Sequence, residues 1–165
     1  MKVVGAIIEN NKGDFLLQKR DNKAPNYPLH WTLFAGAVEK SETPKNAILR
    51  ELKEEISLNF SDIESIYQVQ KNIQNNGTIQ CIFHIKTNAK TEDLVLKERE
   101  KMEFVSRKAL FKRKFAFNIK EVFEKYFIYL QNSRVITKLS GKYPMPGISD
   151  VSIEKLEKVL EEIYD

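Results

Sequence analysis

The stretch GAVEKSETPKNAILRELKEEISL, residues 36–58, decides the fold. Thr43 is a residue type that caps helix N-termini, and Pro44 suits the first helical position, where its missing N–H costs nothing. Apolar residues then recur at helical spacing, at Ile48, Leu49, Leu52 and Ile56. The stretch therefore predicts a helix that begins at Pro44 and buries one face.

Three glutamates of this helix fall on one side of it. At about 100° per residue, Glu51, Glu54 and Glu55 lie within an arc of roughly 100°, next to the apolar face. Like charges one turn apart repel, and partial burial adds to the cost. A divalent cation reverses the sign of this local field, and hard oxygen ligands suit Mg²⁺ or Mn²⁺. The alternative is a solvated acidic surface in which Arg50 pairs with Glu54.

The spacing of the fixed residues is more specific than the helix alone. Gly36 is followed after five residues by Glu42, and after seven more by RELKEE, residues 50–55. At about 7% for each residue type, six such matches arise by chance in on the order of one in ten million registers. The chain resembles the Nudix hydrolases, the MutT-like superfamily, directly over residues 36–58 and more loosely over 1–106.

The resemblance implies an α/β (α+β) fold, an α/β/α sandwich with a mixed β-sheet and C-terminal helices. It also implies a pyrophosphohydrolase that acts on phosphorus-containing anhydrides, in which water attacks a nucleoside diphosphate linked to another group. Mg²⁺ or Mn²⁺ is the cofactor that the family uses. Glu51, Glu54 and Glu55 would be the metal ligands, together with a backbone carbonyl at Gly36 or Ala35.

The resemblance also assigns residues around the ligands. Arg50 is expected to pair with Glu42 and so to orient the loop on the helix. Arg20 ends a strand where the family often places an arginine that contacts the nucleotide or its phosphates. Catalysis is expected to depend on Arg50 together with the glutamates Glu51 and Glu54.

The general base is expected in a loop before a late strand, in the run KEREKMEF, residues 97–104. Glu98 has the spacing most familiar from the family. Glu100 and Glu103 are rivals, as are the helix glutamates, and a Lys/Glu surface loop without a catalytic role is an equal alternative.

Three positions depart from the pattern of the family. Ser57 stands where a glycine usually takes a left-handed backbone angle past the helix end, which costs another residue about 1 kcal/mol. Phe34-Ala35 replaces a common Pro-Gly, and Ala37 replaces a glycine or lysine. None of these changes removes a carboxylate, so metal binding is expected to be intact.

The flanking sequence supplies strands and further helices. Strands are predicted over residues 2–9, 14–20, 31–34, 63–74, 78–87 and 102–105. Turns are predicted at 10–13 and 75–77, and a loop at 21–30. Helices are predicted over 118–131, with Asn118 as N-cap, and over 149–164. Trp31 and Phe34 are expected in the core rather than stacked on a base. Residues 1–132 form the predicted Nudix domain, and 133–165 form a packed loop-and-helix extension of it.

Composition limits the classes of function. The 165 residues suit one domain, and no apolar run approaches the roughly 20 residues that span a bilayer. Two histidines and the lone Cys81 cannot build a Cys/His zinc cage, which takes about four ligands. The single cysteine and an N-terminus without a secretory pattern predict a cytoplasmic location.

The partner is expected to be a small-molecule nucleotide. A net charge of +4 is mild and does not favour nucleic acid, although the basic run at 107–114 leaves an RNA 5′ end open. Among small molecules, a (d)NTP or oxidised purine nucleotide, ADP-ribose and a nucleotide sugar all stay open as substrates. A nucleotide-binding module without catalysis is open too, as is a homodimer formed through the C-terminal tail.

Overall fold

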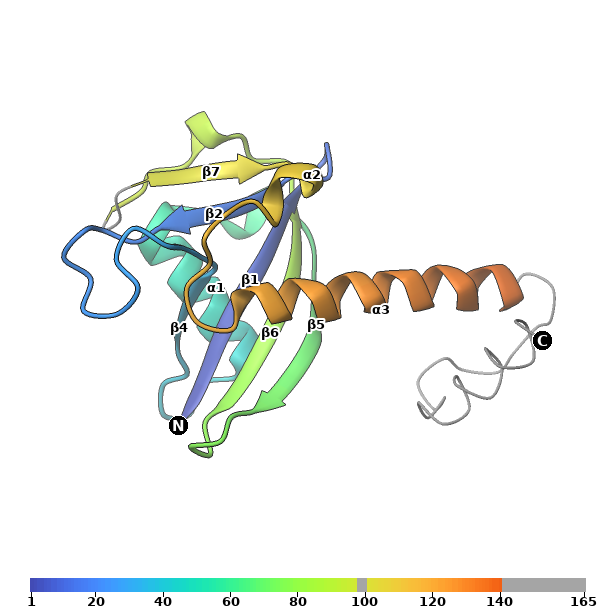
Figure 1. Ribbon diagram of the computed structural model, residues 1–165, viewed down its shortest axis with the longest axis horizontal. Helices are drawn as coiled ribbons and strands as arrows, with labels where there is room; N and C mark the ends of the chain where they lie inside the picture. The colour runs from blue at the N-terminus through green and yellow to red at the C-terminus, as the bar shows by residue number, and fades with distance from the viewer. Residues whose placement is uncertain (98–100, 141–165) are drawn as a thin grey trace. The chain divides into compact units, whose positions relative to one another are not determined.

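The computed structural model describes residues 1–97 and 101–140 (Figure 1). Its strands are β1 (Lys2–Asn10), β2 (Phe15–Lys19), β3 (Trp31–Thr32), β4 (Phe34–Ala37), β5 (Ile63–Ile73), β6 (Ile79–Thr87) and β7 (Lys101–Val105). Its helices are α1 (Pro44–Ile56), α2 (Arg107–Leu110) and α3 (Ile119–Ser140), with short 3₁₀ turns η1 (Phe60–Asp62) and η2 (Thr91–Asp93). Within the described ranges, no helix has the length and apolar content needed to cross a membrane.

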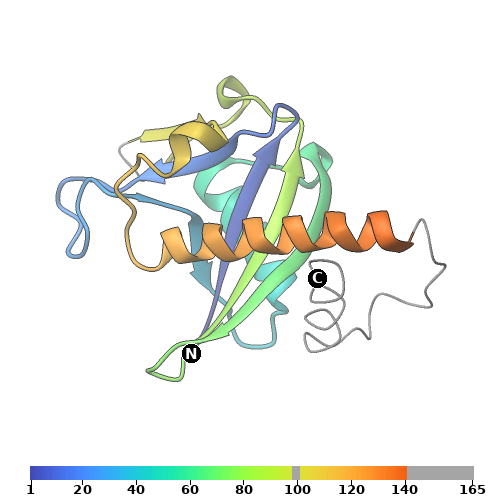
Figure 2. The same ribbon diagram turned by 45° about the vertical axis from the view of Figure 1, so that its right-hand side comes forward.

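The strands join into one mixed sheet. The main order is β3-β2-β1-β6-β5; β4 pairs with β1, and β7 pairs with β2. The long strands β1 and β6 run parallel and lie side by side (Figures 1 and 2), whereas the other pairs are antiparallel. One edge of β1 serves two neighbours, because Val3–Ala6 pair with β4 and Ile8–Glu9 pair with β2.

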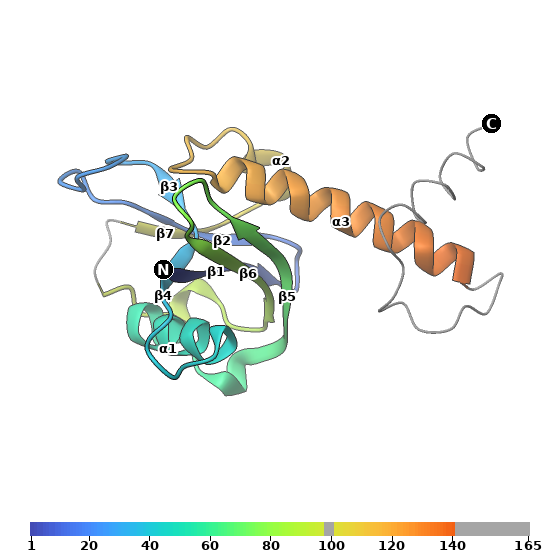
Figure 3. The same cartoon turned by 90° about the horizontal axis from the view of Figure 1, so that it is seen from below.

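Alternation along β1 separates two layers of core. Val4, Ala6 and Ile8 are buried in the cluster that also contains residues of α1. On the other face, Glu9 accepts a hydrogen bond from the hydroxyl of Tyr126 in the early turns of α3. Figure 3 shows α1 on one face of the sheet and the start of α3 on the other. The predicted α/β/α sandwich is confirmed.

Helix α1 begins and ends as local chemistry requires. The Thr43 hydroxyl accepts a hydrogen bond from the backbone N–H of Asn46 at 3.2 Å, and Pro44 occupies the first helical turn. Ala47, Ile48, Leu52 and Ile56 are buried. The helix ends at Ile56, and the residue after it, Ser57, has φ 57° and ψ 24°. The serine therefore adopts the left-handed backbone that the sequence pattern reserves for glycine.

Both predicted hairpin turns are confirmed. The Asn10 side chain accepts hydrogen bonds from the backbone N–H groups of Lys12 and Asp14, and Gly13 has φ 79°. At the second turn, Gly77 has φ 76°. Each turn thus places a glycine at the one position where a positive φ is needed.

The strand predicted over residues 31–34 is instead two strands, β3 and β4, and the prediction was wrong in this detail. The carbonyl of Leu33 accepts a hydrogen bond from the buried side-chain amide of Gln18 at 3.0 Å. β3 pairs with β2 and β4 pairs with β1, so the chain changes its partner at this residue.

Helix α3 starts where predicted and continues to Ser140, beyond the predicted end at 131. Asn118, the predicted cap, donates its side-chain amide to Gln80 at 3.1 Å. The early turns bury Val122, Phe123 and Tyr126. Residues Met1–Tyr126 form one compact unit. The predicted 149–164 helix lies outside the described residues, and the domain boundary at 132 stays a prediction.

Candidate active site

The first contact of the site joins β4 to α1. A Cβ atom placed on Gly36 would overlap the carboxyl group of Glu51, because that carboxyl group occupies the space beside the Gly36 backbone. Glu51 lies in the middle of α1, whose buried residues fix the helix against the sheet. Only glycine leaves room for this close approach of the helix carboxylate to the strand, so the pairing explains a glycine in a strand.

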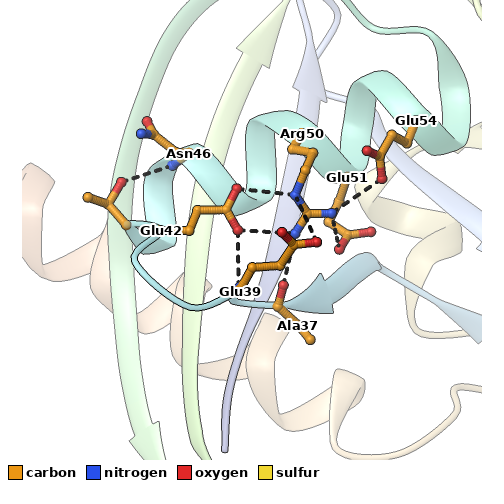
Figure 4. Close-up of polar contacts among 8 residues, drawn as sticks. Ala37, Glu39, Glu42, Asn46, Arg50, Glu51 and Glu54 are labelled. Carbon is orange, nitrogen blue, oxygen red and sulfur yellow. Dashed lines mark hydrogen bonds and ion pairs between the residues drawn. The ribbon is translucent and has the colours of Figure 1, made fainter.

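Arg50 connects the loop before α1 to the helix (Figure 4). Its Nε and Nη2 atoms donate to the two carboxylate oxygens of Glu42, each at 3.1 Å. Its Nη2 also donates to the carbonyl of Ala37 at 3.0 Å. The hydrogen bond from Arg50 holds the pKa of the Glu42 carboxyl below its ordinary value, and the pKa of Arg50 is raised in turn. The predicted Arg50–Glu42 pair is confirmed.

The remaining nitrogen of Arg50 faces the helix glutamates. Nη1 donates to Glu51 Oε1 at 2.9 Å and to Glu54 Oε2 at 3.2 Å. The Glu51 side chain is 16% exposed, whereas that of Glu54 is 60% exposed. One guanidinium therefore donates hydrogen bonds to three carboxylates, and the Arg50–Glu54 pair expected of a plain acidic surface is among them.

Glu55 marks the C-terminal end of the acidic face. Its Oε2 atom is buried from solvent. Its backbone carbonyl accepts a hydrogen bond from the N–H of Lys97 at 3.1 Å, and the carbonyl of Ile56 accepts one from Val95. The chain between β6 and β7 is thus fastened to the end of α1. Glu98 and Glu100 follow this fastened point but lie outside the described residues, so their roles stay predictions.

Glu103, another candidate base, is engaged elsewhere. It lies in β7 and forms ion pairs with Lys101 and Arg113. The hydrogen bond from Lys101 is the largest cause that holds the pKa of Glu103 below its ordinary value. A carboxyl with a lowered pKa and two cationic partners is a weak proton acceptor near neutral pH.

The structure places Arg20 within the loop that follows β2. Its Nε atom donates to the carbonyl of Asn26 at 3.0 Å, and its guanidinium lies 5.2 Å from the ring centre of Phe117. A contact between Arg20 and phosphate stays a prediction. Trp31 and Phe34 are both buried, as predicted, and the guanidinium of Arg113 covers the Trp31 ring at 4.8 Å.

The carboxylates suit a divalent metal by chemistry. They are hard oxygen donors, as Mg²⁺ and Mn²⁺ prefer. Among residues 1–97 and 101–140, no three acidic, histidine or cysteine side chains are grouped closely enough to hold a metal as they stand. Glu51 and Glu54 both turn to Arg50 Nη1. The set therefore fits a metal if the two glutamates leave that nitrogen.

Sequence reasoning missed two features of the site. The Ala37 carbonyl that accepts from Arg50 carries no signal in the sequence, because every residue has a carbonyl. The close approach of the Glu51 carboxyl group to the Gly36 backbone could have been suspected, because a glycine within a strand often marks such an approach. Gly36 was predicted only as a carbonyl ligand, and that role stays a prediction.

Comparison with known proteins places the chain in a family. The NUDIX domain model matches residues 1–126. An uncharacterised Nudix hydrolase of Listeria innocua is 42% identical over 57 residues, which cover 34% of each chain. An RNA pyrophosphohydrolase of Pseudoalteromonas translucida is 31% identical over 117 residues, which cover 61% of this chain and 64% of that protein. The chain thus spans from about a third to under two thirds of the length of these relatives.

A solved structure of a Deinococcus radiodurans protein has the same fold. Its TM-score is 0.64 at 17% identity, over 75% of this chain and 81% of that one. At this identity the likeness concerns the fold alone. Nudix hydrolases generally use divalent metal ions. Because the family model covers residues 1–126 of 165, this chain belongs to the Nudix family.

Proposed function

We propose that this chain is a metal-dependent pyrophosphohydrolase of nucleotides in which a nucleoside diphosphate is linked to another group. The observation that carries the proposal is the cluster of Glu51, Glu54 and Arg50, with Glu51 seated on Gly36 and Arg50 fixed by Glu42. Membership of the Nudix family supports the same reaction class.

Each residue of the cluster has a distinct task in this proposal. Glu51, Glu54 and Glu55 would hold Mg²⁺ or Mn²⁺. When bound, the ion neutralises phosphate charge and lowers the pKa of water. Arg50 fixes the loop before α1 through Glu42, so that this loop stays in place as substrate binds.

The proposed reaction breaks one phosphoanhydride. A carboxylate, Glu98 or a helix glutamate, accepts a proton from water. The water oxygen forms a bond to one phosphorus, and the P–O bond to the bridging oxygen breaks. The other phosphate leaves with the electron pair of that bond. Catalysis then depends chiefly on positioning and on stabilisation of negative charge.

A substrate panel tests the proposal. The full chain would be incubated with nucleoside triphosphates, oxidised purine nucleotides, ADP-ribose and nucleotide sugars, each with Mg²⁺ or Mn²⁺. Hydrolysis in ¹⁸O-labelled water then shows which phosphorus accepts the new oxygen. Metal-dependent product from at least one nucleotide, lost in Glu54→Gln, is the expected result. Binding without phosphate or pyrophosphate release would instead identify a non-catalytic nucleotide-binding module.

A second candidate substrate is the triphosphorylated 5′ end of RNA. The Pseudoalteromonas relative carries the name RNA pyrophosphohydrolase. In this chain, the basic run at 107–114 has exposed cations, namely Arg107, Lys108, Lys112 and Lys114. RNA held by these cations should bind with a steep dependence on salt. Faster pyrophosphate release from 5′-triphosphorylated RNA than from free nucleotides would favour this candidate.

Cellular location and assembly stay predictions. The lone Cys81 is buried in the core cluster that also contains residues of α1. A homodimer would appear as a concentration-dependent mass in light scattering.

A further inference from the structure

We propose that a surface cluster outside the acidic site binds the planar base of a nucleotide. The cluster, here called the aromatic platform, consists of Arg20, Tyr27, Leu29, His30 and Phe117. This inference rests on the proposed function, because the nucleotide bound by the platform is taken to be the substrate of the enzyme. It assigns a place for the base, whereas the acidic site handles the phosphates.

Two segments far apart in the sequence form the platform. The Tyr27 ring lies 4.9 Å from the Phe117 ring and 5.7 Å from the His30 ring, measured between centres. Backbone hydrogen bonds join the segments beside it, from Trp31 N–H to the Lys114 carbonyl and from Ala116 N–H to the Trp31 carbonyl. The loop that contains Tyr27 is therefore fastened to the segment that precedes α3 (Figure 1).

The large apolar side chains of the platform are exposed. Tyr27 is 47% exposed, Leu29 45% and Phe117 53%. These same three residues have positive φ angles of 51°, 58° and 52°. A left-handed backbone costs an ordinary residue roughly 1–2 kcal/mol. These side chains are about half exposed, so their burial offsets little of this backbone strain. Residues with strained backbone angles gather at binding sites.

The charges of the platform select the type of ligand. The Arg20 guanidinium lies over the Phe117 ring at 5.2 Å, and its Nε atom is held by the Asn26 carbonyl. Lys23 and Lys114 add exposed cations on the two segments. Aromatic faces beside cations suit a flat ring that carries phosphate, because bases stack on aromatic side chains and phosphates pair with cations.

His30 adds a hydrogen-bonding group at the edge. Its Nδ1 atom lies 2.7 Å from the Pro28 carbonyl. A carbonyl only accepts, so Nδ1 carries a proton, and in the tautomer with its single proton on Nδ1 the Nε2 atom is an acceptor. An acceptor next to the Tyr27 ring can bind an amino or imino hydrogen of a base.

The platform lies within reach of the acidic site. His30 precedes Gly36 by six residues, which limits the distance between their Cα atoms to about 20 Å. Figure 3 shows the loop between β2 and β3 and helix α1 toward the same edge of the sheet, on opposite sides of it. One nucleotide that runs around this edge could place its base on the platform and its phosphates toward Glu51.

Calorimetric titration tests the platform without hydrolysis. AMP, GMP, CMP and UMP are compared with ribose 5-phosphate, which lacks the base. The test variant is Tyr27→Gly/Phe117→Gly, and Phe60→Ala, an exposed phenylalanine of η1, is the matched control. A stacked base contributes about 1–3 kcal/mol of binding free energy. The test variant should therefore bind the preferred monophosphate about 5- to 150-fold more weakly. Its affinity for ribose 5-phosphate should equal that of the wild type.

Thermal unfolding separates binding from a structural role. Glycine relieves the positive φ at both positions, so the test variant should unfold at the same temperature as the wild type or higher. A marked fall in that temperature would show that the side chains merely hold the loop, and would overturn the platform. Unchanged affinity for the monophosphate would overturn the platform too. This holds even if the variant differs from the wild type in its oligomeric state in solution.

The outcomes for platform and enzyme remain distinct. The wild type could bind the base, lose that binding in the test variant, and yet hydrolyse none of the nucleotides in the panel. This result would support the platform and reject the proposed activity. Hydrolysis of a nucleotide, together with equal binding by wild type and test variant, would reject the platform and leave the activity standing.

Discussion

The carboxyl group of Glu51 occupies the space that a side chain on Gly36 would need. This relationship ties the acidic face of α1 to β4, the strand that precedes it. It also fixes where the helix carboxylates lie relative to the backbone at the end of the strand. The position of the proposed metal ligands thus depends on the absence of one methyl group.

Gly36→Ala is therefore expected to displace Glu51. The new methyl group would overlap the carboxyl carbon, so the carboxylate must leave its seat. Metal-dependent hydrolysis should fall by about 10-fold or more, as when supporting residues of metal sites are changed. Gly5→Ala is the matched control, because its methyl group meets the flexible end of Ile82 on the adjacent strand. Equal rates for the two variants would contradict the assigned role of Gly36.

Arg50→Gln should separate metal binding from hydrolysis. Loss of the guanidinium frees Glu51 and Glu54 from a competing cation, so Mn²⁺ should bind at least as tightly as to the wild type. Loss of the pair with Glu42 loosens the loop, and hydrolysis should slow by about 10-fold or more. Lys53→Gln removes another cation of α1 and should change neither. Weaker Mn²⁺ binding by Arg50→Gln would count against competition between the guanidinium and the metal.

The lowered pKa of the Glu42 carboxyl should make the free energy of unfolding depend on pH. Its pKa in the folded chain is below the ordinary value of 4.5, chiefly because Arg50 donates hydrogen bonds to it. The ionised carboxylate therefore adds stability above about pH 4.5, and this stability is lost as pH falls through the folded pKa. The free energy of unfolding of Glu42→Gln should lie below that of the wild type at pH 7, and the difference should shrink below pH 4.5.

Urea titrations at a series of pH values measure that difference. Glu92→Gln, on the exposed η2 turn, serves as the control and should follow the wild type across the series. A gap between Glu42→Gln and wild type that stays constant into strong acid would show that the carboxylate charge is not its source.

Ser57→Gly should stabilise the fold. Ser57 has φ 57°, a left-handed angle that a glycine adopts without steric cost. The free energy of unfolding should rise by about 0.5–1 kcal/mol, after allowance for the greater freedom of glycine in the unfolded chain. Ser57→Ala keeps the Cβ atom and should give no such gain. A glycine variant no more stable than the alanine variant would mean that the angle carries no strain.

Much of the fold follows from local signals in the sequence. Thr43-Pro44 gives the start of α1, and glycines at 13 and 77 mark both hairpins. These features depend on residues close in sequence, so single-sequence reasoning can find them. The break between β3 and β4 could not be found in this way, because it depends on Gln18, which donates to Leu33 from another strand.

The candidate site shows the same limit. The resemblance carried by RELKEE predicted the Arg50–Glu42 pair, which the structure confirms. The role of its glutamates as metal ligands stays a prediction. The sequence also offered the Arg50–Glu54 pair, but it did not predict that Arg50 donates to Glu51, because side-chain direction depends on the loop that packs across the helix. Nor could the sequence show that Tyr27 and Phe117, which are far apart along the chain, meet at one surface.

The most direct test of the account is a titration of the full chain with Mn²⁺, followed by electron paramagnetic resonance of the free ion. The account predicts saturable binding to the wild type and loss of that binding in Glu51→Gln/Glu54→Gln/Glu55→Gln, with folding verified by circular dichroism. Binding of Mn²⁺ that is equal in the folded triple variant, or absent from the wild type, would contradict the claim that these carboxylates hold a metal.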